Sequence, residues 1–313
     1  MRSELVELAS VIGSGEAMLF TGAGFSAGAR DLGGNPLPDS AQMIRELWPL
    51  VFDTQGETRG ETDAETDAAL DAGTSAEPDD SSLPDLYDAA LLRAPERLRA
   101  YVASRLRIGD HELPDHYAAW FSGPWRRIYT LNVDDLERAV ARQFQLPRPL
   151  RSISAICRDE RPAAPGELDV VHLNGLAGDA AAEVTFSTMQ YASRLCSRDR
   201  EYERLVVDLE RAPFVFVGTK LDEVVLWQHV ELHRRANGAN GANGANGAAL
   251  RRPRQSPSFL ISSSLSRARQ VLLESLGIRW IRSTFEELAG ELWTDPRARL
   301  ARDLPARDLP ARS

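Results

Sequence analysis

The sequence predicts an α/β fold, in which helices cover both faces of a doubly wound parallel sheet. Short apolar runs of strand length alternate with amphipathic stretches of helix length, a pattern typical of strands buried on both faces. The composition, 43% hydrophobic and 27% charged over 313 residues, is that of an ordinary soluble globular chain. The stretch from about 37 to 125 has helical patterns without strands, which indicates a helical module inserted between the first two strands.

Six apolar runs are expected to form the sheet, and helical stretches follow most of them. The strands are predicted at 17–20, 126–131, 169–173, 213–219, 257–262 and 278–281. The helices between them are predicted at 134–144, 187–210, 222–236 and 266–277. Within the module, helical patterns occupy 37–52, 83–106 and 116–123. We therefore expect one αβ domain over residues 1–295, with the module as a helical cap.

Three biased tracts are interpreted as loops or tails. The segment 53–82 holds ten acidic residues and one Arg, so it accounts for the whole net charge of −9, and its composition predicts a disordered loop. Four tandem ANG triplets predict a flexible loop over 236–256, and a doubled ARDLP predicts a disordered tail over 296–313. Neither repeat has the period of a solenoid.

Several function classes are disfavoured by composition. Cys157 and Cys196 lie far apart and outside any CxxC pair, so we expect neither a disulfide framework nor a four-thiolate zinc site. His229 and His233 have a metal-binding spacing but lack a third ligand, and we expect no metal. No apolar run has the length of a membrane span, and one short basic run gives little support to nucleic-acid binding. We expect a cytoplasmic protein.

A glycine-rich turn follows the first predicted strand. In GAGFS, Gly22 and Gly24 would let backbone N–H groups approach a phosphate, and a helix beginning near Ser26 would point its positive end at the anion. The alternative is a tight turn that binds nothing. The spacing GxGxSxG lacks the full GxGxxG pattern, so an ordinary dehydrogenase is not expected.

Three further strand ends carry polar residues. Asn132 and Asp134 follow the second strand, and period-two geometry places both on one side; Asp134 or Asp135 is also a candidate cap for the next helix. His172, near the end of the third predicted strand, and Asn174, just after it, have the same spacing. At the end of the strand predicted at 213–219, Gly218 and Thr219 begin the segment GTKL, 218–221, just before a helix.

Together, these segments resemble the sirtuin superfamily, in particular the bacterial SIR2-like NAD-consuming domains of antiphage defence. GAGFS, TLNVD at 130–134 and GTKL resemble three motifs of that family, and LNG at 173–175 falls where the family has LHG. TFSTMQY at 185–191 and LLESLGIRWI at 272–281 agree with its later segments, and all occur in family order over roughly residues 5 to 290. The resemblance implies a Rossmann-like SIR2 fold.

The resemblance also implies an NAD site. The phosphates would be lined by the backbone and small side chains of Gly22, Ala23, Gly24, Phe25 and Ser26. Asn132 and Asp134 would face the nicotinamide and its ribose. Gly218, Thr219 and Lys220 would hold the adenosine side, with Lys220 either pairing with a phosphate or simply solvated.

The departures from the family select the chemistry. The CxxC pairs of the sirtuin zinc ribbon are missing. In the deacetylases of the family the first glycine loop is followed by PDFR, whereas this sequence has GARDLGGNPLPD there. Deacetylation is therefore disfavoured. Hydrolysis of NAD+ to nicotinamide and ADP-ribose remains, in which the protein must orient a water and stabilise developing charge. Asn132 is the candidate for orienting that water.

The family's catalytic histidine corresponds to Asn174, and an amide cannot accept a proton at neutral pH. His172 is the nearest histidine; it either takes over the acid/base role or is a buried histidine bonded to a neighbouring carbonyl. The alternative function is therefore a noncatalytic NAD- or ADP-ribose-binding regulatory or assembly subunit, and a third is ADP-ribose transfer. The resemblance further implies a homo-oligomer, or a sensor or ATPase partner, that restrains the activity.

Overall fold

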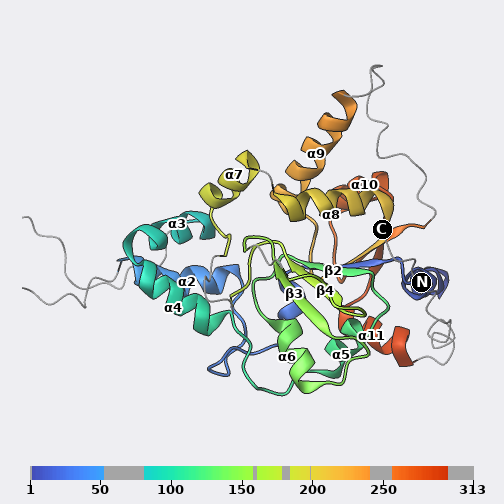
Figure 1. The fold of residues 1–313 in the computed structure, drawn as a ribbon, viewed down its shortest axis with the longest axis horizontal. Coiled ribbons are helices and arrows are strands. Elements are labelled where there is room, and N and C mark those ends of the chain that lie inside the picture. Colours follow the sequence, from blue (N-terminus) through green and yellow to red (C-terminus); the bar gives the residue numbers. More distant parts are fainter. Residues whose placement is uncertain are drawn as a thin grey trace, which may run out of the picture.

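The computed structural model describes residues 2–52, 81–157, 161–177, 184–197, 199–239 and 256–294. Its centre is a seven-stranded sheet in the order β3-β4-β2-β1-β5-β6-β7, with every neighbouring pair of strands parallel (Figure 1). The strands are β1 (Met18–Thr21), β2 (Arg127–Thr130), β3 (Leu150–Ser154), β4 (Leu168–His172), β5 (Phe214–Val217), β6 (Ser258–Ser262) and β7 (Ile278–Arg282). All six predicted strands are confirmed.

The strand β3 was not predicted. It lies at one edge of the sheet, beside β4, and four of its five residues are only half-buried. Its sequence LRSIS is therefore not a continuous apolar run.

Alternate residues of the central strands point into two separate cores, so the sheet is covered on both faces. Leu19 and Val215 lie side by side in adjacent strands and belong to one core. Phe20 and Phe216 are the next pair and belong to the other. This alternation follows from the pleat of the strands. The predicted doubly wound parallel sheet is confirmed.

Separate groups of helices cover the two faces of the sheet (Figure 1). The first group is α1 (Arg2–Gly13), α5 (Asp115–Phe121), α6 (Leu136–Gln143) and α11 (Phe285–Thr294). The second group is α8 (Arg200–Arg211), α9 (Val224–Ala239) and α10 (Arg267–Ser275). Among the described residues, no helix combines the length and the apolar character that a membrane crossing requires.

The helical stretch predicted at 187–210 is two helices, α7 (Thr188–Cys196) and α8. The side chain of Ser187 caps the first turn of α7, in a capping box with Gln190. The side chain of Asp199 accepts a bond from the Tyr202 N–H and begins α8. A second N-cap inside the amphipathic stretch therefore starts a new helix.

A third core lies among α2 (Ser40–Phe52), α3 (Leu83–Arg93) and α4 (Pro95–Arg105), beside the sheet (Figure 1). We call these three helices the helical cap. Its core also contains Val133, Ala177 and Val184, from the loops that follow β2 and β4. The predicted module extended to 125, but α5 packs on the sheet instead.

The predicted loops fall mostly outside the described residues. Of the acidic segment 53–82 only the last two residues are described, and the tail 296–313 lies wholly outside. The first four residues of the predicted loop 236–256 belong to α9, which continues to Ala239.

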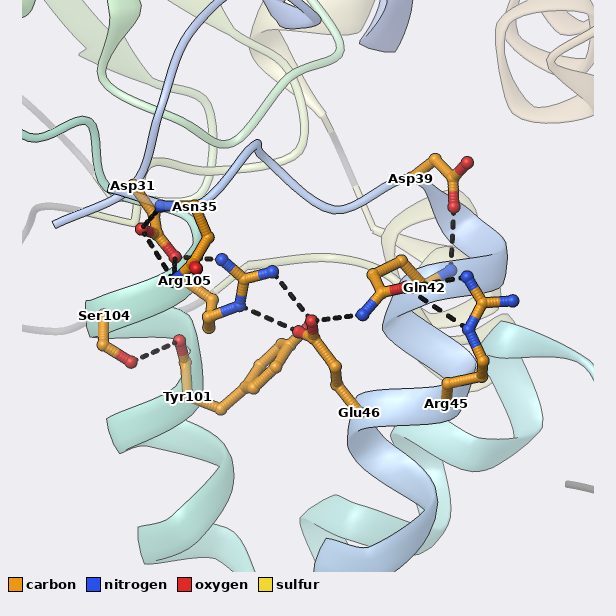
Figure 2. A network of polar contacts seen from close by, with 9 residues as sticks. All are labelled: Asp31, Asn35, Asp39, Gln42, Arg45, Glu46, Tyr101, Ser104 and Arg105. Atoms are coloured by element: carbon orange, nitrogen blue, oxygen red, sulfur yellow. Dashed lines mark hydrogen bonds and ion pairs between the residues drawn. The ribbon is translucent and has the colours of Figure 1, made fainter. Parts of the chain in front are cut away.

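An ion-pair network fastens the helical cap to the loop that follows β1 (Figure 2). Arg105 of α4 contacts Glu46 of α2 with Nε and Nη2, at 2.9 and 2.7 Å, and donates to Asp31 with Nη1. Asp31 also accepts the backbone N–H of Asn35 at 2.8 Å. Burial opposes ionisation of Asp31, but these donors outweigh it and lower its pKa. The network therefore joins three segments through two carboxylates.

Replacing Arg105 with alanine is expected to lower the free energy of unfolding by roughly 3 kcal/mol, because the buried Asp31 carboxylate loses its cation. The measurement is urea denaturation at neutral pH. Arg45→Ala is the matched control, because Arg45 donates only to the Gln42 amide at an exposed position and should change stability by less than about 0.5 kcal/mol. Equal losses in the two variants would contradict the structural role of the network.

Candidate functional site

The glycine-rich turn leaves β1 at Thr21 and forms a single 3-10 turn, Ala23–Ser26. The helix predicted to begin near Ser26 is wrong: the next helix, α2, begins at Ser40. The intervening residues include three glycines, with Gly34 at a φ of +83°, and two prolines, all of which disfavour a helix. A helix N-terminus is therefore not available here for binding an anion.

The glycines serve a close contact between two loops. The N–H groups of Gly22 and Gly24 donate to the carbonyls of Val217 and Gly218, at 3.0 and 2.9 Å. A Cβ on Gly22 would lie 2.8 Å from the Gly218 carbonyl oxygen. These two amides are bonded to carbonyls rather than free for a phosphate, which corrects the predicted role of the glycines. The loops after β1 and β5 therefore lie in direct contact.

Gly218 has the tightest fit in this contact. Its φ is +67°, and a Cβ there would lie 2.2 Å from the backbone N of Phe25. Gly218→Ala should therefore lower the free energy of unfolding by about 2 kcal/mol or more, as measured by chemical denaturation. Gly277→Ala is the matched control, because Gly277 has a φ of +73° with nothing within 4 Å of its Cβ position. If both variants lose the same free energy, only backbone conformation matters and the loop contact does not.

A small cavity lies beneath this contact, at the carboxyl ends of β1, β2 and β4. It is lined by Thr21, Phe25, Ser26, Phe121, Ile128, Thr130, Asn132, Asp134, Leu136, Glu137, Val170 and His172. The amide of Asn132 donates to the Ser26 hydroxyl at 2.8 Å, and Asp134 lines the same cavity. The prediction that Asn132 and Asp134 share one side is thus confirmed. Val133, between them, packs into the core of the helical cap.

Asp134 differs from Glu137, the other carboxyl group of this cavity, because its surroundings disfavour the ionised form. Burial raises its pKa to about 6, although the Ser26 hydroxyl and His172 favour the ionised form. Its Oδ1 also accepts the Leu136 N–H at 3.2 Å, so Asp134 helps to cap α6 as predicted. A carboxylate with such a pKa is mostly ionised at neutral pH and can still accept a proton there.

His172 lines the cavity, but both its ring nitrogens face acceptors. Its Nδ1 lies 3.0 Å from the Asn132 carbonyl oxygen, and its Nε2 lies 3.2 Å from Oε1 of Glu137 in an ion-pair contact. The interpretation of His172 as a buried histidine bonded to a neighbouring carbonyl is therefore confirmed.

Sequence reasoning missed Glu137. The available signal was its position on the buried side of α6, next to Leu136 and one turn before Val140, where a glutamate needs a partner.

Asn174 does not line the cavity with His172. Strand β4 ends at His172, so the alternation of side chains stops there. The Asn174 amide donates to the Leu131 carbonyl at 3.1 Å, and its Oδ1 lies 3.5 Å from the Tyr202 hydroxyl. Asn174 therefore fixes the loop after β2 to α8.

The remaining predicted residues lie on the loop after β5. The Thr219 hydroxyl donates to Glu223 at 2.5 Å and accepts the Leu221 N–H at 2.8 Å, so it holds the loop between β5 and α9 together. Lys220 is exposed, in line with the interpretation of a solvated lysine. Of the predicted nucleotide-binding residues, Phe25, Ser26, Asn132 and Asp134 line the cavity, while Gly22, Gly24, Gly218 and Thr219 form the loop contact above it.

No protein-family model matches the chain, and no curated protein matches it either.

Proposed function

We propose that this protein hydrolyses NAD+ to nicotinamide and ADP-ribose at the cavity beneath the two glycine loops. The supporting observation is the meeting of an amide, a hydroxyl and a carboxyl group, from Asn132, Ser26 and Asp134, in a buried cavity at the strand ends. It lies at the carboxyl ends of β1, β2 and β4, and the carboxyl ends of the strands are where open α/β sheets bind ligands. The ordered sirtuin-like motifs support the same assignment.

The donor set suits a hydrolysis that needs little acid. The bond between the ribose C1′ and the nicotinamide nitrogen breaks with its electron pair leaving on nicotinamide, and the oxygen of a water bonds to C1′. Asn132 orients that water, held in place by Ser26. Asp134 accepts the proton that the water loses, which its pKa of about 6 permits at neutral pH. The apolar wall from Phe25 and Phe121 excludes other waters.

The biological role proposed with this activity is depletion of cytoplasmic NAD+ as a prokaryotic antiphage effector, restrained by self-assembly or by a sensor or ATPase partner. This role depends on the sirtuin-like motifs.

The noncatalytic alternative is favoured by one observation. Asn174, at the family's histidine position, is an amide engaged with Leu131 and Tyr202, and therefore supplies no proton acceptor. A protein of this kind would bind NAD or ADP-ribose without turnover.

The two functions separate in one experiment. Purified protein, over a range of concentrations that allows assembly, is incubated with NAD+, and nicotinamide and ADP-ribose are quantified by chromatography. Equal amounts of both products support the hydrolase. Calorimetric binding of ADP-ribose without any product supports the binder, and neither heat nor product would overturn both.

A further inference from the structure

A line of polar contacts crosses the carboxyl edge of the sheet from β3 to the loop after β2. The hydroxyl of Ser152 donates to Oε1 of Glu137 at 2.5 Å. The same oxygen lies 3.2 Å from Nε2 of His172, and Nδ1 of His172 lies 3.0 Å from the carbonyl oxygen of Asn132. The side chains of Glu137 and His172 are each 2% exposed. The line therefore ends on the backbone of the residue whose amide faces the cavity.

The partners of His172 fix its protonation. A carbonyl oxygen and a carboxylate are both acceptors, so a neutral imidazole would direct a lone pair at one of them. The imidazolium suits both contacts, since Nδ1 then donates to the Asn132 carbonyl while Nε2 forms an ion pair, without a hydrogen bond, with the Glu137 carboxylate. Burial opposes this charge, but Glu137 outweighs it and raises the pKa of His172. A charged ring that donates from Nδ1 and carries a proton on Nε2 has no free lone pair, so it cannot also act as a general base.

A buried ion pair needs an explanation other than stability. Removing two charges from water costs as much as their attraction returns, and apolar residues of similar size stabilise a fold equally well. Two other charged groups face the pair: the Asp134 carboxyl, and the Arg138 guanidinium, whose Nε lies 3.8 Å from Oε1 of Glu137. Unlike two apolar side chains, the ion pair can fix the direction of a backbone carbonyl, that of Asn132.

We propose that Glu137 and His172 are positioning residues that fix the carbonyl of Asn132 and so aim its amide at Ser26 and the cavity. His172 donates to the carbonyl, Glu137 keeps His172 charged and oriented, and Ser152 holds Glu137. This inference rests on the proposed function for its kinetic consequence only, because the protonation and the orientation are properties of the free protein.

The first test does not depend on activity. With 15N-labelled histidine, the ring nitrogens of His172, assigned from the spectrum of His172→Gln, should both be protonated at pH 7. The Asn132 side-chain amide signal, assigned from Asn132→Ala, should shift in Glu137→Gln. A neutral single tautomer at His172, or an unchanged Asn132 signal, would overturn the inference even if the protein hydrolyses NAD+.

The second test separates positioning from structural support. In Glu137→Gln, kcat should fall roughly 10- to 100-fold with KM little changed. The acidic limb of the pH profile of kcat should persist, because it belongs to Asp134. Glu210→Gln is the matched control, since Glu210 faces His233 at 3.4 Å in a similar pair between α8 and α9, and it should leave kcat unchanged.

If Glu137→Gln does not fold, Ser152→Ala removes one donor to Glu137 and should still lower kcat several-fold. An unchanged kcat in a folded variant, or loss of the acidic limb with it, overturns the positioning role. Absence of any turnover in the unaltered protein overturns the proposed function alone, because the first test then still decides the inference.

Discussion

Asn132→Ala is expected to lower the rate of nicotinamide release by about a thousandfold, because it removes the amide that we propose orients the attacking water. Folding should suffer little. The variant loses one side-chain hydrogen bond to Ser26 at a half-buried position, worth about 1 kcal/mol. The measurement is product formation at saturating NAD+, with thermal unfolding of the same sample.

Asn174→Ala is the comparison for that variant. Because the Asn174 amide bonds to Leu131 and Tyr202, its removal should lower stability more than turnover. Full activity of Asn132→Ala would refute the role of Asn132. A folded Asn174→Ala protein without activity would instead assign the catalytic role to position 174.

Asp134→Asn is expected to abolish turnover and at the same time stabilise the protein. The pKa of Asp134 is about 6 in the folded protein, against an ordinary value of 3.8, so the folded state holds the proton more tightly. The protonated carboxyl therefore stabilises the fold at pH 4, and this contribution is lost as the pH rises to about 6 and above. At pH 7 the loss amounts to roughly 3 kcal/mol. An asparagine does not ionise, so the variant does not lose this free energy at pH 7.

The measurement is the free energy of unfolding of both proteins between pH 4 and pH 8. The variant should be more stable at pH 7 and indistinguishable at pH 4. The control is Asp135→Asn, next in the chain: the Asp135 carboxylate accepts the Ile108 N–H at 2.7 Å and faces Arg107, so its neutralisation should not stabilise. A variant of Asp134 that is less stable than the parent at pH 7 would contradict the buried-charge interpretation.

The sheet could be predicted because its central strands are buried on both faces and therefore read as apolar runs. The edge strand β3 could not, since a half-buried edge permits Arg151 and Ser152 among its apolar residues. The break between α7 and α8 was visible only as Asp199, one candidate cap among many polar residues.

For the site, the spacing of Asn132 and Asp134 predicted the right side, because both line the cavity although β2 already ends at Thr130. The same rule failed for Asn174, because its amide instead donates to the Leu131 carbonyl. Gly22 and Gly24 were predicted to let a ligand approach, whereas in the structure they let the loop after β5 approach. The sequence shows that a backbone segment lacks side chains, but not whether a ligand or another loop packs against it. The partnership of Glu137 with His172 depends on the neighbouring positions of α6 and β4, which no local pattern records.

Val133 connects the helical cap to the cavity. Its side chain is buried among α2, α3 and α4, while the residues on either side of it face the cavity, and its carbonyl accepts the Ala177 N–H at 2.7 Å. The positions of Asn132 and Asp134 therefore depend on how Val133, between them, packs in the core of the helical cap. A larger or smaller side chain among the cap helices would therefore displace the side chains of Asn132 and Asp134 together, without contacting either of them.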